Sequence, residues 1–348
     1  VFTNILGKKE LASQPTISRF LNSLDKKAMA FLNDLLLTLF EKGNNFKTTE
    51  NIVLDIDSTN FTTFGKQEGS NYNYHYSAKG YHPLMLFNGL NGDLIKVELR
   101  EGNVYTSNNS ISFLEPIFKW LKQKYLGTTI LLRGDSGFAS SEIYDLCYDY
   151  DIDILIKLKA NAILKKLSNP ALNCFMREFE SDYSKYHVIY DEFDYKANSY
   201  SRPIRVICKI EREAGELLPR VTFIATTLKS EPKDIVRAYN KRGNMENFIK
   251  EAKLDFFMDT ASHTTFIANA IKTLIKALAY SIVNIMKRFI LPKDMQKSRL
   301  LSIRNNLIKI ACRCVKSGRK TIFKLCKNSP YQNIFGIIVQ NIESVAFS

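Results

Sequence analysis

The sequence predicts a mixed α/β protein, in which helices flank a mixed sheet and an all-β insertion interrupts the core. Up to about residue 160, short β-branched runs alternate with helical apolar stripes. From about 172 to 228 the sequence is β-like, and after Glu231-Pro232 it is strongly helical to about 290. Of its 348 residues, 45% are hydrophobic and 24% charged, so the chain can bury a sizeable core, and wholesale disorder is excluded.

The first elements are two predicted helices and a strand. Residues 15–49 are expected to be helical, because the apolar residues of 28–40 recur at helical spacing. A β-branched strand over 51–56 then runs into Asp57-Ser58-Thr59. The next segments are, in order, a polar, aromatic loop (65–76) and two strands (81–86 and 94–99) separated by Asn-Gly turn signals.

The following segments alternate helix and strand. They are a helix (110–125), a strand (128–132), a helix (141–150) and a strand (152–158). A ribonuclease-H-like core accommodates this order of elements, which is strand, hairpin, helix, strand, helix and strand. We therefore predict a helical N-terminal segment (1–49), a ribonuclease-H-like domain (50–290) with a β insertion at about 161–228, and a basic helical C-terminal segment (291–348).

Positive charge is concentrated near the C-terminal end of the sequence. The chain has 49 Lys and Arg against 35 Asp and Glu, a net charge of +14. Between Lys287 and Lys327 there are thirteen basic residues and one acid, which accounts for +12 of that charge. Apolar residues are interleaved with these cations, so we expect amphipathic helices with a basic outer face. A solvated face is the ordinary interpretation of such a run, but its length and single sign favour contact with nucleic acid.

Cysteine spacing argues against a zinc-ribbon protein, and hydropathy argues against a membrane protein. The six cysteines lack the spacing of a zinc ribbon, so reduced thiols in the cytoplasm are expected. No apolar run of about 18 residues is free of charge, which argues against a membrane partner. The longest candidate, Ala268 to Leu291, is broken by Lys272, Lys276 and Lys287.

Three acids fall where such a core would bring them together. Asp57 follows the first strand, Asp135 follows the fourth, and Glu246 lies in the helical region after the insertion. An acid at a strand end is commonly only a turn or cap residue. Asp55 is an alternative to Asp57, because both carboxylates lie on the same face of the strand. We prefer Asp57, which ends the strand.

Four polar residues are predicted to share one face of the helix that carries Glu246. At about 100° per residue, Tyr239, Arg242, Glu246 and Lys253 fall within an arc of about 60°. The ordinary interpretation is a surface stripe of salt bridges. The same set also suits binding of phosphates beside a metal ligand.

These residues resemble the Tyr-Arg-Glu-Lys signature of DDE-type bacterial insertion-sequence transposases. Asp57-Ser-Thr59 resembles that family's first catalytic aspartate, and Arg133-Gly-Asp135-Ser-Gly-Phe138 resembles its second. Further stretches resemble the branch known as transposase DDE domain, group 1. They are Leu11-Ala-Ser-Gln-Pro-Thr-Ile-Ser-Arg-Phe20, Gly80-Tyr-His-Pro-Leu84 and Leu99-Arg-Glu-Gly-Asn103.

The resemblance implies cut-and-paste DNA transposition by a polynucleotidyl transferase. The implied partners are double-stranded DNA, as terminal inverted repeats and target DNA, and a second copy of the chain as a homodimer in the DNA complex. The implied location is the bacterial cytoplasm, in association with the nucleoid. Members of the family usually have more residues before the Leu11 motif, so segment 1–49 is expected to be a truncated DNA-binding region. Related enzymes place a stacking tryptophan in the β insertion, whereas the single tryptophan here is Trp120.

Phosphodiester cleavage explains why these residue types are needed. Two Mg²⁺ ions about 3.5–4 Å apart activate the attacking oxygen and stabilise the leaving 3′ oxygen, and Mn²⁺ can substitute. Asp57 would bridge the ions, with Asp135 on one and Glu246 on the other. Arg242 can fork onto a phosphate, Lys253 supplies a point charge and Tyr239 a hydroxyl. No organic cofactor and no histidine base are needed, so His82 and Asn161 are weaker candidates.

Two alternatives remain open at this point. One is a stand-alone metal-dependent nuclease, which the Tyr-Arg-Glu-Lys pattern argues against. The other is a truncated or decayed transposase copy that only binds DNA, although all three acids and both basic signature residues are present. A glycosidase with paired carboxylates fits poorly, because neutral sugars do not explain the basic segment.

Overall fold

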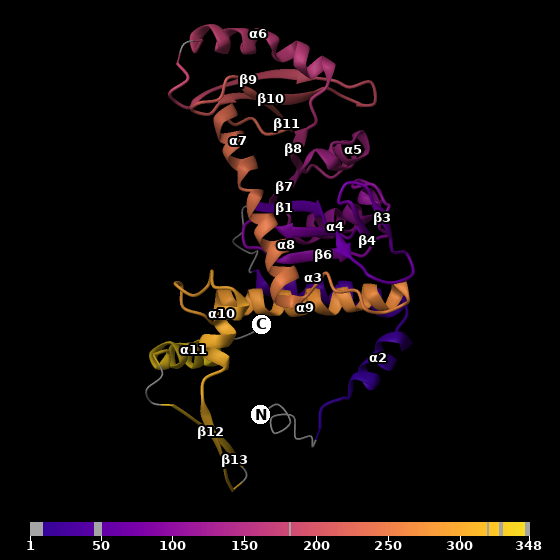
Figure 1. Cartoon of the computed structure of the whole chain (residues 1–348), viewed down its shortest axis with the longest axis vertical. Helices are drawn as coiled ribbons and strands as arrows, with labels where there is room; N and C mark the ends of the chain where they lie inside the picture. Colours follow the sequence, from indigo (N-terminus) through magenta and orange to yellow (C-terminus); the bar gives the residue numbers. More distant parts are fainter. Residues whose placement is uncertain (1–9, 45–50, 181, 319, 327–329, 345–348) are drawn as a thin grey trace. The chain divides into compact units, whose positions relative to one another are not determined.

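The computed structural model describes residues 10–44, 51–180, 182–318, 320–326 and 330–344 (Figure 1). The chain divides into two compact units. Residues 45–247 form one of them, which we call the sheet unit. Residues 1–44 and 248–348 form the other, which we call the helical unit.

The sheet unit is built on an eight-stranded mixed sheet in the order β6-β5-β1-β7-β8-β11-β10-β9. Its first five strands in sequence are β1 (Asn51–Ser58), β5 (Leu84–Asn88), β6 (Leu94–Glu98), β7 (Thr129–Gly134) and β8 (Asp153–Leu158). β1 pairs antiparallel with β5 and parallel with β7, and β7 pairs parallel with β8. β1 is therefore a central strand, and its Ile52, Leu54 and Ile56 are fully buried. The predicted mixed sheet with flanking helices is confirmed.

Two helices and a short turn connect the strands of this core. They are α4 (Ser110–Lys124), the 3₁₀ turn η2 (Ser136–Phe138) and α5 (Ser141–Asp149). The apolar stripe of α4 is buried at 113, 114, 117, 118 and 121. That spacing places the stripe on one helix face, as the sequence predicts. Ser140 caps α5 by accepting a hydrogen bond from the Ile143 N–H.

A small second sheet forms where the sequence predicts a polar loop. Its strands are β2 (Phe61–Thr62), β4 (Ala78–Tyr81) and β3 (Asn71–Asn73), in that order. The loop after β6 lies directly against it, since a Cβ atom on Gly102 would collide with the carbonyl oxygens of Gly80 and Asn71. Glycine at 102 therefore permits a close approach of two backbones.

The insertion is not all-β as predicted. A 17-residue helix, α6 (Ala162–Glu178), precedes its strands β9 (His187–Tyr195), β10 (Ile204–Arg212) and β11 (Arg220–Thr226). Asn161 caps this helix, and Leu164 and Phe175 bury its apolar face. Pro170 lies inside α6 and hides the helical pattern in the sequence. The three strands extend the core sheet, because β11 pairs antiparallel with β8.

After the insertion, the predicted continuous helix is broken. α7 (Pro232–Asn240) ends before Lys241, and α8 (Gly243–Phe256) begins after Arg242. Bonds of the i→i−3 type tighten the chain here, from the Arg242 N–H to Tyr239 O and from the Met245 N–H to Arg242 O. Glycine at 243 is a poor helix former, which is consistent with a break at this position.

The helical unit contains α2 (Gln14–Ser23), α3 (Lys26–Gly43) and α9 (Phe266–Phe289). α9 is long and apolar enough to cross a membrane by length and composition alone. Core helices of soluble proteins meet the same criterion, and more than half of the relevant window is buried in the structure. Gly43 at the end of α3 is buried, and a Cβ atom at this position would collide with the Ile285 side chain on α9. The absence of a membrane partner stays a prediction.

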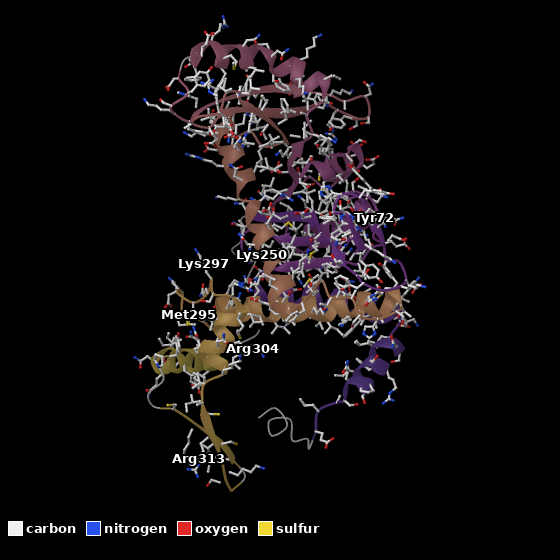
Figure 2. All side chains as sticks on the ribbon, viewed as in Figure 1. Tyr72, Lys250, Met295, Lys297, Arg304 and Arg313 are labelled. Atoms are coloured by element: carbon white, nitrogen blue, oxygen red, sulfur yellow. The ribbon has the colours of Figure 1, made fainter. Side chains whose placement is uncertain are left out.

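The basic C-terminal segment is not wholly helical as predicted. Two short helical turns, α10 (Leu300–Ile303) and η3 (Arg304–Ile308), lead into a hairpin of β12 (Cys312–Ser317) and β13 (Lys320–Leu325), and α11 (Gln332–Ser344) follows. Part of the basic segment therefore lies on a two-stranded ribbon that carries Arg313 (Figure 2). Strand pairing places Arg313 opposite Lys324. Gly318 has a φ of 58°, a left-handed conformation that suits the hairpin turn. Lys327 lies outside the described residues.

Candidate active site

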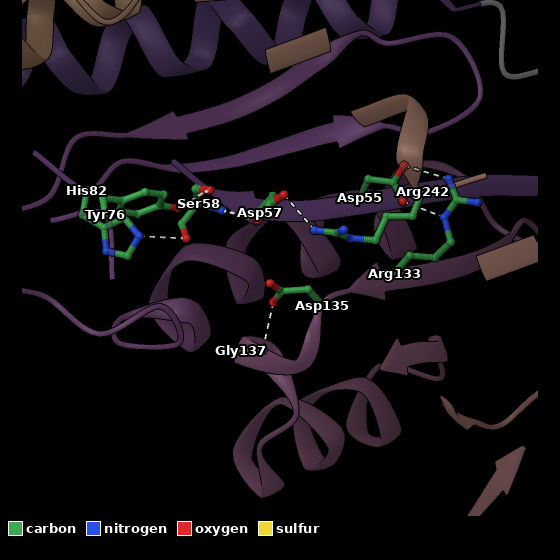
Figure 3. Close-up of polar contacts among 9 residues, drawn as sticks. All are labelled: Asp55, Asp57, Ser58, Tyr76, His82, Arg133, Asp135, Gly137 and Arg242. Atoms are coloured by element: carbon green, nitrogen blue, oxygen red, sulfur yellow. Dashed lines mark hydrogen bonds and ion pairs between the residues drawn. The ribbon is translucent and has the colours of Figure 1, made fainter. Parts of the chain in front are cut away.

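Asp55 is fully buried in an ion pair with Arg133 (Figure 3). The guanidinium donates from Nε to Oδ1 at 2.6 Å and from Nη2 to Oδ2 at 2.7 Å. Its Nη1 donates to the carbonyl oxygen of Ala238 at 2.7 Å. Burial raises the pKa of Asp55, and the hydrogen bonds and charge of Arg133 oppose that rise. Both oxygens of the Asp55 carboxylate accept hydrogen bonds from Arg133 on β7, and Arg133 also donates to Ala238 on α7. The pair therefore links β1 to β7 and to α7.

Asp57 lies two residues further along β1, in different surroundings. Its Oδ1 accepts the Ser58 N–H at 2.8 Å, and its Oδ2 accepts Arg242 Nη2 at 2.7 Å (Figure 3). Burial raises the pKa of Asp57 to about 6 despite the attraction of Arg242, and the negative charges of Asp135 and Glu246 add to the rise. Two of the predicted acids, Asp135 and Glu246, therefore act electrostatically on the third, Asp57.

Asp135 follows β7 and caps the η2 turn. Its Oδ1 accepts the Gly137 N–H at 2.8 Å (Figure 3). Parallel pairing of β1 with β7 places the ends of the two strands at the same edge of the sheet. Asp57 and Asp135 consequently line one cleft of about 590 Å³. The structure brings these two residues together as the sequence predicts.

Glu246 and Tyr239 flank the break between α7 and α8. Glu246 is exposed in the first turn of α8 and contributes to the raised pKa of Asp57. Burial raises the pKa of Tyr239 to about 12, an effect that Arg242 opposes and that Asp135 and Asp57 reinforce. Tyr239 therefore lies within the electrostatic influence of Asp57 and Asp135, and Glu246 acts on Asp57.

Arg242 lies in the turn between the two helices, and only 9% of it is exposed. Burial lowers its pKa, but the attraction of Asp57 and the other acids outweighs that effect, and the net shift is upward. The predicted single helix face for 239, 242, 246 and 253 is wrong, because the helix breaks at 241–242. The tight turn nevertheless directs the Arg242 guanidinium at Asp57.

Lys253 belongs to α8 but falls in the helical unit. Burial lowers its pKa, and Asp259 in the same unit opposes the decrease. Its predicted part in phosphate binding stays a prediction, because the positions of the two units relative to each other are not determined.

The chemistry of this cluster suits a divalent cation. Among the described residues, no three His, Cys, Asp or Glu side chains are arranged to hold a metal ion. In this arrangement Arg242 occupies one oxygen of Asp57. A largely buried carboxylate, whose pKa is raised by burial and further by two neighbouring carboxylates, is nevertheless an environment that a cation would stabilise. Carboxylate oxygens are the donors that Mg²⁺ and Mn²⁺ accept.

His82 and Ser58 form part of the cleft wall. His82 Nδ1 lies 2.8 Å from the Val104 carbonyl oxygen, which can only accept, so Nδ1 carries the hydrogen. Nε2 then accepts from the Ser58 hydroxyl at 2.9 Å. Burial lowers the pKa of His82, which favours this neutral form. These hydrogen bonds hold His82 in place, so His82 supports the cleft wall beside Asp57.

The weaker candidate Asn161 and the single tryptophan, Trp120, lie outside the cleft lining. Asn161 caps α6 through the Leu164 N–H at 2.9 Å and donates to the Tyr195 hydroxyl at 3.1 Å. Trp120 lies on α4 beside Tyr125, with ring centroids 5.6 Å apart. Both sets of contacts are structural.

Sequence reasoning missed part of the cleft lining. The missed residues include Tyr72, Tyr74, Tyr105 and Lys159. They come from three separate segments of the chain, so spacing in the sequence gives no sign that they meet. The aromatic content of the predicted loop 65–76 was the one signal available.

Comparisons with known proteins agree with the motifs. The family described as transposase DDE domain group 1 matches residues 1–346. No curated protein matches the chain. Among solved structures, a cryo-EM structure of the piggyBac transposase synaptic complex with hairpin DNA is similar, with 12% sequence identity and a TM-score of 0.39. The match covers 81% of this chain and 60% of that one. This likeness is too weak to assign a fold or a site.

Proposed function

Because the chain belongs to the transposase DDE domain group 1 family, we propose that it cuts DNA at the ends of a transposable element and transfers the cut strands into target DNA. The observation that carries the proposal is the convergence of Asp57 and Asp135 in one cleft, with Glu246 close enough to raise the pKa of Asp57. Its partners would be double-stranded DNA at the terminal repeats and at the target.

We assign the three carboxylates to metal binding. Asp57, Asp135 and Glu246 would hold two Mg²⁺ ions, or Mn²⁺ in their place. When bound, the metal supplies Lewis-acid stabilisation of the attacking and leaving oxygens. The attacking water or 3′ hydroxyl would give its proton to solvent water, and its oxygen would form a bond to phosphorus. The departing 3′ oxygen would take the electron pair of the broken bond and a proton from solvent.

Arg242 would exchange partners when DNA and metal bind. In the absence of both, its guanidinium neutralises Asp57 through one nitrogen, Nη2. Metal binding at Asp57 would release that nitrogen, and a phosphate is the anion that a guanidinium binds well through two donors. Tyr239 and Lys253 would add a hydroxyl and a cation to the same phosphate-binding set.

The strand order supports a ribonuclease-H-like core. Five strands run in the order β6-β5-β1-β7-β8, with β5 antiparallel to its neighbours β1 and β6. In this topology Asp57, near the end of β1, and Asp135, just after β7, lie at one sheet edge. We further propose a homodimer in the DNA complex and a bacterial cytoplasmic, nucleoid-associated location.

Cleavage of a DNA end tests this function. The substrate is a labelled duplex carrying a terminal repeat taken from the DNA that flanks the gene. The unaltered chain should nick it with Mg²⁺ or Mn²⁺, and not with EDTA. Asp57→Ala, Asp135→Ala and Glu246→Ala should bind the duplex at least as well but cut it over a hundredfold more slowly.

Two results would contradict the proposal. Binding of the duplex without any cleavage by the unaltered chain would support the DNA-binding-only alternative. Cleavage of any duplex without strand transfer would support the stand-alone nuclease.

A further inference from the structure

A second cavity, of about 520 Å³, lies where α4 and α5 begin in the sheet unit. Its lining includes Ser110 and Ser112 at the start of α4, and Ser140 and Glu142 at the start of α5. None of the three proposed metal ligands lines it. The first N–H groups of a helix have no acceptor within the helix and carry a partial positive charge, so a cavity at this place suits an anion.

The described residues cap the start of α5 but not the start of α4. At α5 the Ser140 hydroxyl accepts the Ile143 N–H, and hydrogen bonds to the Glu142 carboxylate lower the pKa of that residue. At α4 the N-cap residue, Asn109, accepts no hydrogen bond through its side chain from any residue that the structure describes, and the first turn has no acid. The positive end of α4 is therefore open to an external acceptor.

Ser110, the first residue of α4, carries a hydroxyl that also needs a partner. Only 1% of the residue is exposed, and its Oγ has no hydrogen-bond partner among the described residues. Leaving a buried hydroxyl unpaired is unfavourable, so such a group at a cavity wall points to a ligand or an ordered water. Because Ser110 lines the cavity at the open helix end, its hydroxyl and the helix N–H groups can donate to one acceptor.

Two carboxylates line the same cavity, and both have hydrogen-bond donors elsewhere. Glu115 accepts the Tyr150 hydroxyl at 3.4 Å, and Glu142 accepts donors at the start of α5. Their charge weakens the attraction of an anion without occupying the start of α4. A cation is a poorer occupant, because two helix ends place partial positive charge at the cavity.

The cavity continues the walls of the proposed catalytic cleft. One wall passes from Thr106 in the cleft to Ser107 in the cavity, and the other passes from Gly137 to Ser140. The two segments lie against each other, since a Cβ atom on Gly137 would collide with the Thr106 side chain. A DNA strand that lies in the cleft can therefore reach the cavity along these two segments.

Arg100 holds the segment that leads to α4. Only 3% exposed, it donates from Nη1 to the carbonyl oxygens of Thr106 and Asn108, at 3.0 and 2.7 Å. Its Nε donates to the His82 carbonyl oxygen at 2.9 Å. These bonds fix the start of α4 relative to the cleft, and rigid support reduces the entropy lost when a ligand binds.

We propose that the start of α4 binds one backbone phosphate of the DNA strand, beside the phosphate that is cut. The inference rests on the proposed function, because the strand must first lie in the cleft. A phosphate carries the negative charge that an open helix end favours, and its oxygens accept from N–H and hydroxyl donors alike. The contact would hold the strand in register without reading its sequence. Free inorganic phosphate has the same chemistry, so the experiment separates the two sources.

Position 112 separates binding from folding. Ser112 is exposed at the third position of α4, where a glutamate stabilises the helix end and repels a phosphate. Ser112→Glu should therefore keep or raise the melting temperature while it blocks the site. Ser112→Gln has the same shape without the charge, and both variants lose the bond from the Ser112 hydroxyl to the Asn109 carbonyl oxygen. Asn173→Glu adds the same charge on the exposed face of α6, away from the cavity lining.

The measurement is the affinity of the full chain for an uncleavable DNA end, by fluorescence anisotropy. A single methylphosphonate, which removes the charge of one phosphate, is moved along the strand beside the cut. We expect one position at which it lowers the affinity of the unaltered chain, Ser112→Gln and Asn173→Glu by at least about tenfold, as for one charge-assisted hydrogen bond. Ser112→Glu should bind the unmodified end about tenfold more weakly and should lose the effect at that position. Ser110→Ala should lose part of it.

Three outcomes would overturn this inference alone. They are equal losses of affinity in Ser112→Glu and Ser112→Gln, an equal loss in Asn173→Glu, and a scan in which no position distinguishes Ser112→Glu from the unaltered chain. If in the last case inorganic phosphate raises the melting temperature of the unaltered chain but not of Ser112→Glu, the ligand is free phosphate and not DNA. Failure of the unaltered chain to bind the DNA end would overturn the proposed function as well.

Discussion

Asp55 and Asp57 show how two identical side chains on one strand acquire different properties. Asp55 is enclosed with a guanidinium that satisfies both of its oxygens. Asp57 lines an open cleft and has two other carboxylates nearby. The first arrangement stabilises the fold, since breaking a buried ion pair leaves an uncompensated charge. The second costs stability and is typical of functional sites.

Exchanging each acid for its amide should separate these roles. Asp55→Asn should lower the free energy of unfolding by about 3–5 kcal/mol, because it leaves Arg133 buried without its partner. Asp57→Asn should change the free energy of unfolding much less at pH 7, yet be inactive in cleavage. Arg242 loses a partner, but a largely buried negative charge beside Asp135 and Glu246 is also removed. Urea unfolding followed by circular dichroism, together with the cleavage assay, measures both.

If Asp55→Asn fails to fold, the double variant Asp55→Asn/Arg133→Met provides the control. It removes both charges and should recover much of the lost stability. A stable but inactive Asp55→Asn beside an active Asp57→Asn would reverse the assignment of the first acid.

The raised pKa of Asp57 predicts a pH dependence of stability in the absence of metal. The unfolded carboxyl titrates near 3.8 and the folded one near 6, so between these values the folded state binds more protons. Stability due to Asp57 should therefore be highest below pH 4, fall as the pH rises to about 6, and stay constant above. The decrease amounts to about 3 kcal/mol for a shift of this size.

The measurement is the difference in unfolding free energy between the unaltered chain and Asp57→Asn, in EDTA, from pH 4 to pH 7. Other titrating groups largely cancel in that difference. A difference that does not change with pH would show that Asp57 titrates normally.

Elements differ in how well the sequence predicts them. The strands that carry Asp57 and Asp135 could be predicted, because β-branched runs end at these acids and parallel pairing then brings the ends together. The break at 241–242 could not, since it depends on i→i−3 bonds rather than on a proline. The hairpin of β12 and β13 was missed because alternating cations and apolar residues also fit a short amphipathic helix. α6 was missed because Pro170 interrupts its pattern.

The hairpin leads to a prediction about salt. A two-stranded ribbon fits the DNA major groove. Strand pairing places the exposed cations Arg313, Lys320 and Lys324 on one face of the ribbon and Lys316 on the other, so phosphates on both sides of the groove are within reach of a cation. Replacing all four by Gln should flatten the slope of log K against log salt by about two to three and a half units, at about 0.9 per phosphate contact. Binding should weaken alike for all DNA sequences.

Fluorescence titrations at several salt concentrations measure this slope. A matched control replaces four exposed lysines of the sheet unit by Gln, namely Lys165, Lys166, Lys185 and Lys196. An equal change of slope in both variants would mean that only net charge matters. No change in the hairpin variant would mean that its cations are simply solvated.

The net positive charge and the acids assigned to catalysis belong to different units of the molecule. The sheet unit, residues 45–247, has 26 basic and 26 acidic residues, so the net +14 of the chain lies entirely in the helical unit. The acids that we assign to catalysis are thus in a neutral unit, and we expect the general attraction to DNA to come from the other unit. This division could be counted from the sequence only once the structure had defined the units, because the helical unit joins two distant segments.

The central claim is that Asp57, Asp135 and Glu246 together hold the metal that cuts DNA. Electron paramagnetic resonance of Mn²⁺ counts the bound ions directly, with the full chain bound to an uncleavable DNA end. We predict two Mn²⁺ per chain, and at least one fewer in Asp57→Asn, Asp135→Asn and Glu246→Gln. Asp191→Asn, which removes an acid of β9 in the same unit, should leave the count unchanged. Equal Mn²⁺ binding by the unaltered chain and by all three carboxamide variants would contradict the claim.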